Sequence, residues 1–375
     1  PRRRLSLMAA RFYGTQPRTV VAVTGTSGKT STASYCQQTW TRLGVKAVSL
    51  GTLGIRGPGV DRYGSLTTPD PVALHGLLAE IKEAGINFVA MEASSHGLDQ
   101  FRLDAVKPEI AVFTTFGRDH MDYHRTEEAY FNAKARLFRE LLLTEGLAVL
   151  NADQPAVMEL CKDIERRGIR LKTFGRGDAA QNRILSVNPV ADGQQISIEF
   201  EGRNWQGTIP LYGEFQVMNI MAAMSAVSFY TDVTEDIFAV LPKLKGVPGR
   251  LEMVAEHPAG AHIFVDYAHT PQALENVLAT IRRHATGKLK VVFGCGGNRD
   301  QGKRPLMGAI AVKLADEAIV TDDNPRDENP AAIRKAILDA APGAIEIGER
   351  AEAITSTVQS LDAGDVLLIA GKGHE

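Results

Sequence analysis

The stretch Thr19-Val-Val-Ala-Val-Thr-Gly25-Thr-Ser-Gly28-Lys29-Thr30 decides how this chain folds. Its first six residues predict a buried strand, and residues 29–43 predict a helix. The two glycines between them let backbone N–H groups approach a phosphate, and the helix N-terminus adds a favourable field. Lys29 would contact the β- and γ-phosphates, and Thr30 would bind Mg²⁺. The stretch therefore predicts a nucleotide-binding phosphate loop; the alternative is an incidental glycine-rich turn.

The same alternation of strand and helix continues along most of the chain. Continuous apolar strands separated by helices are typical of a parallel sheet that is covered on both faces. We expect further strands at 45–50, 87–91, 109–114 and 147–151, and helices at 72–84, 126–142 and 216–230. Between 183 and 209 the apolar residues alternate with period two around Asp192-Gly193 and Glu201-Gly202. These dipeptides favour hairpin turns, so this segment is predicted to be a small antiparallel meander.

A domain boundary is expected at Lys245-Gly-Val-Pro-Gly-Arg250, which holds two glycines and a proline. Beyond it the pattern predicts strands at 263–266, 289–293, 318–321 and 366–370, and helices from Pro271, Pro305 and Pro330. We therefore predict an α/β protein. Residues 18–248 would form a central phosphate-loop domain with a mainly parallel sheet, and residues 249–375 a doubly wound, Rossmann-like domain. Residues 1–17 would be a linker.

The composition excludes several classes of protein. Lys and Arg number 42 against 44 Asp and Glu, so no positive excess favours a nucleic-acid partner. No apolar run reaches the roughly 18 residues of a transmembrane helix. The basic N-terminal residues 1–12 lack the apolar core of a signal peptide. Cys36, Cys161 and Cys295 are too far apart for a zinc motif or a disulfide framework, which favours a cytoplasmic protein.

Ionisable residues follow two other predicted strands. Glu92 comes directly after the strand at 87–91, at the edge of the sheet where ligands of α/β proteins bind. A carboxylate there is a natural metal ligand, although it would also serve as a helix cap. The segment from Gly117 to His124 holds His120 and several charged residues after the strand at 109–114. Such a cluster indicates a site more often than a lone histidine does.

Ten motifs occur in the order found in Mur ligases, and the chain resembles that family over nearly its whole length. The motifs are TGTSGKTS (24–31), LTTPDP (66–71), MEASSHGLDQFR (91–102), RDHMDYH (118–124), YFNAKARLF (130–138), GRLE (249–252), VDYAHTP (265–271), FGCGGNRDQGKRPLMG (293–308), DDNPR (322–326) and GKGHE (371–375). The family has uridine-binding, ATPase and amino-acid-binding domains, and the resemblance implies that most of the first is lacking here. The sequence departs from the family at Ser27, Leu66 and Gln216, where asparagine is usual or can occur.

The resemblance implies a ligase that uses ATP and Mg²⁺. ATP would phosphorylate a substrate carboxylate to an acyl phosphate, and an amine would then displace the phosphate to form an amide. The implied substrates are UDP-N-acetylmuramoyl-L-alanyl-D-glutamate and meso-diaminopimelate, in peptidoglycan precursor synthesis. We expect a monomer with no nucleic-acid or membrane partner.

The resemblance also assigns residues to the reaction. The catalytic residues would be Lys29, Glu92, His120 and Lys134, and the metal ligands Thr30, Glu92, His120 and a carbamylated Lys134. From its sequence context alone, Lys134 would be an ordinary solvated helix lysine. The residues expected at the nucleotide are Gly25, Thr26, Ser27, Gly28, Lys29, Thr30, Ser31, Asn219, Arg250, Asp266 and His269, which implies closure of both domains on the substrates.

The two other substrates are assigned in the same way. The UDP-sugar dipeptide would contact Thr67, Thr68, Ser94, Gln100 and Arg102. The amino acid would contact Arg299, Asp323, Asn324, Pro325, Arg326, Gly371 and Glu375. In the family the DNPR tetrad accompanies diaminopimelate, whose distal carboxylate suits the bidentate fork of an arginine. Without the family context, the same segment is a turn and a helix start with Asn329 as the cap.

Three alternatives to this function remain. Another ATP-dependent amide ligase of the superfamily, such as a folylpolyglutamate synthase, would differ in the substrate that releases phosphate. A phosphate-loop NTPase that acts as a switch or motor would be stimulated by a macromolecule and would leave the second domain without a purpose. A fragment that only binds its ligands would show no turnover.

Overall fold

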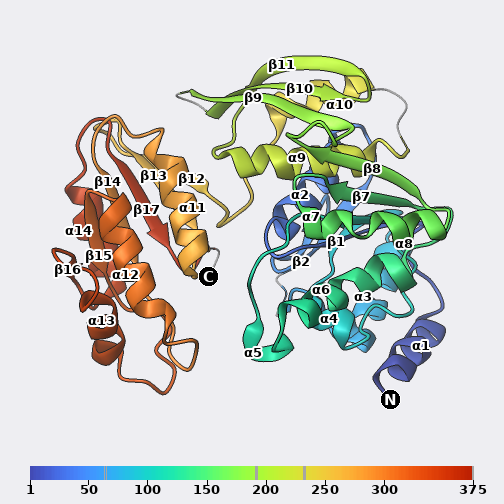
Figure 1. The fold of residues 1–375 in the computed structure, drawn as a ribbon, viewed down its shortest axis with the longest axis horizontal. Coiled ribbons are helices and arrows are strands. Elements are labelled where there is room, and N and C mark those ends of the chain that lie inside the picture. The colour runs from blue at the N-terminus through green and yellow to red at the C-terminus, as the bar shows by residue number, and fades with distance from the viewer. Residues whose placement is uncertain (63, 65, 191–192, 231–233, 374–375) are drawn as a thin grey trace. The chain divides into compact units, whose positions relative to one another are not determined.

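The computed structural model describes residues 1–62, 64, 66–190, 193–230 and 234–373 (Figure 1). The chain divides into two compact units, each with its own sheet. The first unit comprises residues 1–188, 195–209 and 215–244, and the second comprises residues 189–194, 210–214 and 245–375. Both units combine helices with a mainly parallel sheet, so the predicted α/β fold class is confirmed. The exact domain limits, 18–248 and 249–375, stay a prediction.

Within the described residues, the first unit is built on an eleven-stranded sheet of order β11-β10-β9-β8-β7-β6-β1-β5-β2-β3-β4. The strands from β9 to β2 run parallel, and β3 and β4 are added in antiparallel fashion beside β2. The strands are β1 (Thr19–Thr24), β2 (Ala47–Gly51), β3 (Gly54–Gly57), β4 (Val60–Arg62), β5 (Phe88–Glu92), β6 (Ile110–Phe113), β7 (Leu147–Asn151), β8 (Arg170–Gly175), β9 (Asn182–Val190), β10 (Gly193–Phe200) and β11 (Arg203–Ile209). The predicted meander is present as β9 to β11, and its turn at 201–202 has two positive φ angles, as a tight hairpin requires.

Helices cover this sheet because its central strands are buried on both faces. They are α1 (Arg2–Tyr13), α2 (Lys29–Arg42), α3 (Pro71–Glu83), α4 (Ser95–Asp99), α5 (Met121–His124), α6 (Glu127–Arg136), the π-helical η1 (Leu137–Leu141), α7 (Pro155–Met158), α8 (Cys161–Arg166), α9 (Glu214–Val227), α10 (Thr234–Val240) and the 3₁₀ turn η2 (Leu241–Lys243). Local sequence defines several starts: Asp70 accepts from the N–H groups of Val72 and Ala73 ahead of α3. The single helix expected at 126–142 is instead α6 followed by η1.

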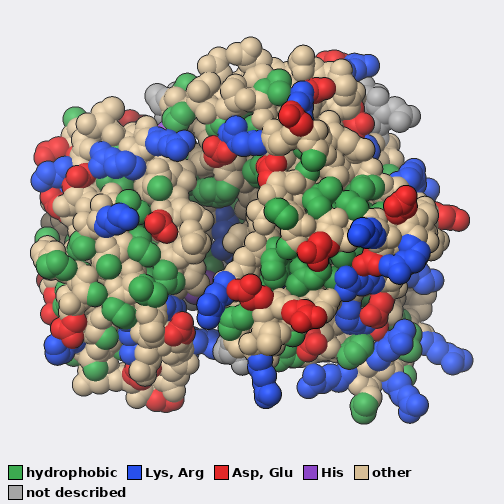
Figure 2. All heavy atoms as spheres, in the orientation of Figure 1, with side chains coloured by type: hydrophobic (Ala, Val, Ile, Leu, Met, Phe, Trp, Pro, Cys, Tyr) green, Lys and Arg blue, Asp and Glu red, His purple; other side chains and the backbone are tan. Residues whose placement is uncertain are grey.

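The segment expected to be a linker contains a helix. α1 packs on α3, where the ring of Tyr13 lies against Gly76, and Arg3 pairs with the buried Asp104. Its outer face carries arginines, and Figure 2 shows Lys and Arg side chains gathered over this end of the unit. Phe12 on the same helix is 83% exposed.

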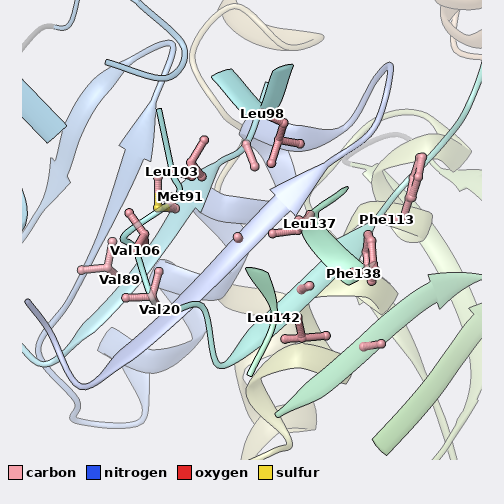
Figure 3. Packing of buried hydrophobic residues seen from close by; sticks show 14 of the residues in the cluster. Val20, Val89, Met91, Leu98, Leu103, Val106, Phe113, Leu137, Phe138 and Leu142 are labelled. Carbon is pink, nitrogen blue, oxygen red and sulfur yellow. The ribbon is translucent and has the colours of Figure 1, made fainter. Parts of the chain in front are cut away.

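The main core of the first unit lies between the parallel strands and the helices on one side (Figure 3). Val20, Met91 and Phe113 reach it from β1, β5 and β6, and Leu137 and Phe138 reach it from η1. The rings of Phe113 and Phe138 stack with their centroids 5.9 Å apart. In the wider π-helical turn the side chains of Leu137 and Phe138 are both fully buried. We attribute the change from α-helix to π-helix at this point to the packing of these two side chains.

The second unit holds, among the residues described, a six-stranded sheet of order β12-β13-β17-β14-β15-β16. Its elements are β12 (Glu252–Glu256), β13 (His262–Asp266), α11 (Pro271–Arg282), β14 (Leu289–Phe293), α12 (Lys303–Leu314), β15 (Glu317–Val320), α13 (Pro330–Leu338), β16 (Ile345–Glu346), α14 (Arg350–Gln359) and β17 (Val366–Ala370). All neighbours are parallel except β12, which lies antiparallel to β13. Pro271 and Pro330 start their helices as predicted, whereas α12 begins at Lys303, two residues before Pro305.

In the part of the chain that the structure describes, none of the helices combines the length and apolar character that crossing a bilayer requires.

Phe138→Ala tests the core. Removing this fully buried ring should destabilise the first unit by about 3–5 kcal/mol, because the cavity cannot collapse completely. Urea unfolding measures the loss, and Leu143→Ala, at a 40% exposed position of the following segment, is the control. Equal midpoints for the two variants would contradict the described packing.

Candidate active site

The phosphate loop lies between β1 and α2, as predicted. Gly28 occupies the cap position of α2 with φ +85°, and no side chain caps the helix; a helix N-terminus of this kind favours an anionic ligand. A Cβ atom on Gly25 would collide with Thr114 Oγ1, and one on Gly28 would collide with Asn219 Oδ1. Only glycine therefore fits at these two positions.

Two threonines after β6 hold the phosphate loop in place. Thr26 N donates to Thr115 O at 2.7 Å, and Ser27 N donates to Thr115 Oγ1 at 3.0 Å. Thr114 Oγ1 donates to Ser27 O at 2.5 Å. Our sequence analysis missed both threonines. Their signal was their place at the end of a buried strand, next to β1 in the parallel sheet.

Two lysines converge on the loop. Lys29 Nζ and Lys134 Nζ each donate to the carbonyl oxygen of Gly25 at 2.8 Å. Lys134 is almost fully buried, and its Nζ lies 4.4 Å from the centre of the Tyr130 ring. Burial lowers the pKa of Lys134 well below its usual value, and the charge of Lys29 lowers it further, while Asp119 acts in the opposite direction. Lys134 is therefore not a solvated helix lysine.

Glu92 ends β5 with a buried carboxylate. Among the described residues, the hydrogen bonds to this carboxylate come from Thr52 alone, from N to Oε1 at 2.8 Å and from Oγ1 to Oε2 at 3.4 Å. Thr52 Oγ1 also lies 3.0 Å from Thr67 Oγ1. Gly51 gives the carboxylate its space, because a Cβ there would overlap it. A buried carboxylate with only neutral donors is costly, so this donor set fits a bound cation.

His120 lies in a group of aromatic rings. Its ring centroid is 4.8 Å from that of His96, and its Nε2 is 3.5 Å from Asp119 Oδ2. Burial lowers the pKa of His120, which favours the neutral ring that a metal requires, although Asp119 raises it.

Thr30 and Ser31 lie in the first turn of α2, and both are buried. In the described part of the chain no three Asp, Glu, His or Cys side chains gather closely enough to enclose a metal.

The residues predicted to bind the UDP-sugar dipeptide form one hydrogen-bonded network. Thr68 Oγ1 donates to Glu92 O at 2.9 Å and accepts from Ser94 N at 3.0 Å. Arg102 donates from Nη1 to Thr68 O at 2.6 Å and from Nη2 to Gln100 Oε1 at 2.7 Å. The network joins the segment before α3 to α4, next to Glu92.

Asn219 lies against the phosphate loop. Its Oδ1 faces Gly28, and its Nδ2 donates to Gln216 Oε1 at 3.2 Å. The same oxygen accepts from Tyr35 Oη at 3.0 Å, so Gln216 is satisfied where the family has asparagine. The predicted contact of Asn219 with the base stays a prediction.

In the second unit, the predicted amino-acid residues lie on loops that follow β14, β15 and β17, which are neighbouring strands. They are Arg299; Asp323, Asn324, Pro325 and Arg326; and Gly371. Arg326 is exposed, and its Nη1 donates to Gly297 O at 2.7 Å. Arg299 is exposed on the neighbouring loop. Glu375 lies outside the described residues.

Both carboxylate oxygens of Asp266 accept hydrogen bonds from backbone N–H groups. Its Oδ2 accepts from Leu251 N at 2.6 Å, and its Oδ1 accepts from Ala268 N at 2.7 Å. Burial raises the pKa of Asp266 to about 6, while Arg250 and the two N–H groups act to lower it. The structure thus gives Asp266 a role in holding the start of β12 beside the end of β13.

Arg250 and His269 flank Tyr267. The guanidinium of Arg250 lies 4.9 Å from the centre of the Tyr267 ring, and His269 Nδ1 lies 2.9 Å from Tyr267 O. Lys303 Nζ donates to His269 O at 2.9 Å. The assignment of these two residues and Asp266 to the nucleotide stays a prediction.

Comparison with known proteins agrees with this geometry. Residues 23–227 match the family model "Mur ligase middle domain", and residues 249–373 match "Mur ligase, glutamate ligase domain". The chain belongs to the Mur ligase family and is an ATP-dependent ligase. A protein of Mesorhizobium japonicum named UDP-N-acetylmuramoyl-L-alanyl-D-glutamate–2,6-diaminopimelate ligase is 54% identical over 100% of this chain and 77% of its own length. A protein of Agrobacterium fabrum with the same name is 49% identical over 100% of this chain and 76% of its own length.

Solved structures give the same result. A structure of a UDP-N-acetylmuramoyl-L-alanyl-D-glutamate–2,6-diaminopimelate ligase is 34% identical with a TM-score of 0.73, over 99% of this chain and 76% of that chain. The folylpolyglutamate synthase of Mycobacterium tuberculosis, solved with ADP and AMPPCP, has a TM-score of 0.81 over 98% of this chain and 92% of that chain. At 20% identity, the latter likeness shows a shared fold alone.

Gly25→Ala tests the phosphate loop. The new Cβ would meet Thr114 at a backbone conformation that non-glycine residues avoid at a cost of about 1–3 kcal/mol, so nucleotide affinity should fall at least about tenfold. Titration with a fluorescent ATP analogue measures it. Gly117→Ala is the matched control, because a Cβ there meets nothing within 4 Å. Unchanged affinity in Gly25→Ala would refute the assigned loop.

Proposed function

We propose that this protein joins meso-diaminopimelate to UDP-N-acetylmuramoyl-L-alanyl-D-glutamate, in the synthesis of peptidoglycan precursors. The observation that carries the proposal is the exposed Arg326 on the loop after β15, within Asp323-Asn-Pro-Arg326. Diaminopimelate has a distal carboxylate that lysine lacks, and an arginine offers it two parallel hydrogen bonds. The relatives that share about half of their residues with this chain carry the name of that ligase.

The first half of the proposed reaction transfers the γ-phosphoryl group of ATP to the substrate carboxylate. Two anions must approach each other, so the site has to supply positive charge. Lys29 on the phosphate loop and the N-terminus of α2 supply it toward the phosphates. The product is an acyl phosphate, which the amine of the amino acid then attacks with loss of phosphate.

Mg²⁺ fits beside these groups. Thr30 and Glu92 would hold one Mg²⁺, and His120 together with a carbamate on Lys134 would hold a second. Bound there, Mg²⁺ would neutralise phosphate charge during phosphoryl transfer. Glu92 carries the strongest part of this assignment, because Mg²⁺ prefers oxygen ligands and the buried carboxylate has only neutral donors around it.

Lys134 becomes a ligand only after a chemical change. The lone pair of its neutral amine attacks the carbon of CO₂, so the N–C bond forms as one C=O π bond breaks onto oxygen, and one amine proton leaves to solvent. A neutral amine thereby becomes an anionic carbamate. The lowered pKa of Lys134 favours the neutral amine that this step needs. The carbamate nitrogen keeps an N–H for the carbonyl of Gly25.

The dipeptide substrate would bind beside Glu92. Hydrogen bonds already connect the predicted contact residues there, so each residue helps to hold its neighbours in position. These residues are Thr67, Thr68, Ser94, Gln100 and Arg102. The amino acid would bind in the second unit, with Arg326 or Arg299 on a carboxylate and Asp323 on an ammonium group. The proposal places the protein in the cytoplasm as a monomer, and its three cysteines are unpaired.

The function is tested by ATP-dependent ligation of radiolabelled diaminopimelate or lysine to the UDP-muramoyl dipeptide. We expect product with diaminopimelate and little with lysine. Arg326→Ala should lower kcat/KM for diaminopimelate at least about 30-fold and leave the poor use of lysine nearly unchanged, because lysine has no distal carboxylate to lose its partner.

Arg283→Ala is the control for that variant, since Arg283 is exposed at the end of α11. An equal fall for both amino acids would mean that Arg326 supports the loop and does not contact the distal carboxylate. Preferred use of lysine or glutamate by the unchanged protein would refute the proposed substrate.

A further inference from the structure

Two loops of the second unit are fastened to each other next to Arg326. One contains Gly296, Gly297 and Asn298 and follows β14; the other contains residues 324–328 and follows β15. Gly297 N donates to Asn324 O at 2.9 Å, and Arg326 Nη1 donates back to Gly297 O at 2.7 Å. A Cβ on Gly297 would overlap Pro325 O, so the two backbones touch.

This close approach requires unusual backbone conformations. Arg326 and Asn298 both have φ of +50°, in the left-handed region that non-glycine residues seldom adopt. Asn324 Oδ1 accepts from Arg326 N at 3.3 Å and supports the first of these turns. Conformations of this kind persist only where the surroundings fix them.

Glu328 and the buried Arg304 provide the strongest contacts. Arg304 Nη2 donates to both carboxylate oxygens of Glu328, at 2.9 and 2.8 Å. Glu328 Oε1 also accepts from Asn298 N at 2.5 Å. The carboxylate therefore ties the first turn of α12 and the loop after β14 to the loop after β15. The N–H of Asn298 and then Arg304 lower the pKa of Glu328, so it is ionised at neutral pH.

We propose that Glu328 and Arg304 are positioning residues for the amino-acid substrate: together they clamp the two loops and hold Arg326 in the conformation that binds the distal carboxylate. The proposal rests on the proposed function and deepens it. Neither residue needs to touch the substrate. Their effect passes through the backbone of Asn298 and Gly297 to the guanidinium of Arg326.

The test compares Glu328→Ala and Glu328→Gln with wild type. Glu328→Ala should raise KM for diaminopimelate about 10- to 100-fold, the range expected when a binding group is displaced by about 1 Å. KM for ATP and kcat should stay within about twofold, because the clamp serves only amino-acid binding. Glu328→Gln keeps an oxygen acceptor and should give a smaller rise.

Glu317→Gln is the matched control. Glu317 pairs with Lys288 and Lys290 at the start of β15, at the end of the strand opposite to the clamp, and its exposure is similar, 28% against 24%. It should leave every constant unchanged.

Hydrogen exchange supplies a second measurement that does not depend on activity. The amides of Gly297 and Asn298 should exchange slowly in wild type and faster in Glu328→Ala and Glu328→Gln. Faster exchange with an unchanged KM for diaminopimelate would overturn the proposal, as would an equal loss for ATP and diaminopimelate. If Glu328→Ala does not fold, an unchanged KM in Glu328→Gln overturns it. A wild-type protein that does not use diaminopimelate would refute the proposed function, whereas the exchange rates still report on the clamp.

Discussion

The carbonyl oxygen of Gly25 accepts hydrogen bonds from two lysine side chains, and the arrangement of the first unit depends on this contact. Two ammonium groups beside one oxygen repel each other unless an anion lies between them or one amine is neutral. Burial lowers the pKa of Lys134, which favours its neutral amine and reduces this repulsion. The contact also fixes α6, which carries Lys134, relative to β1 and α2, while Lys29 supplies the positive charge of the phosphate loop.

The order of strands brings the other groups to the same edge of the sheet. β1 lies between β5 and β6, so Glu92 at the end of β5 and Thr114 beyond β6 both lie beside the phosphate loop. β2 lies next to β5 and places Thr52 against Glu92. Parallel strands expose their carboxyl ends together, and this is why residues distant in sequence form one site.

Sequence predicted the parts of the site that have local signals. The spacing of Gly25, Gly28 and Lys29 with a strand before and a helix after defined the phosphate loop, and the structure has it there. The resemblance to Mur ligases found Lys134, whose helix gives no local sign of function. Thr52 and the Arg304–Glu328 pair were missed, because each acts only through a partner that the fold brings near.

For the fold as well, the elements with a local sequence signal were predicted and those without one were missed. Most parallel strands were predicted from continuous apolar runs, whereas β3, β4, β12 and β16 are short or exposed edge strands that carry no such pattern. Residues 1–17 were expected to be a linker, yet contacts with α3 and Asp104 support the helix α1. The π-helical turn η1 depends on the core around Phe138 and leaves no signal in the local sequence.

We propose that burial of Lys134 beside the phosphate loop favours its neutral amine, which then forms a carbamate. Carbon-13 NMR of the protein supplied with ¹³C-bicarbonate tests this most directly. We expect one protein-bound carbamate resonance in wild type, absent from Lys134→Arg, whose guanidinium does not lose its proton at neutral pH. A wild-type protein that binds ATP and shows no such resonance, or one that persists in Lys134→Arg, would contradict the account.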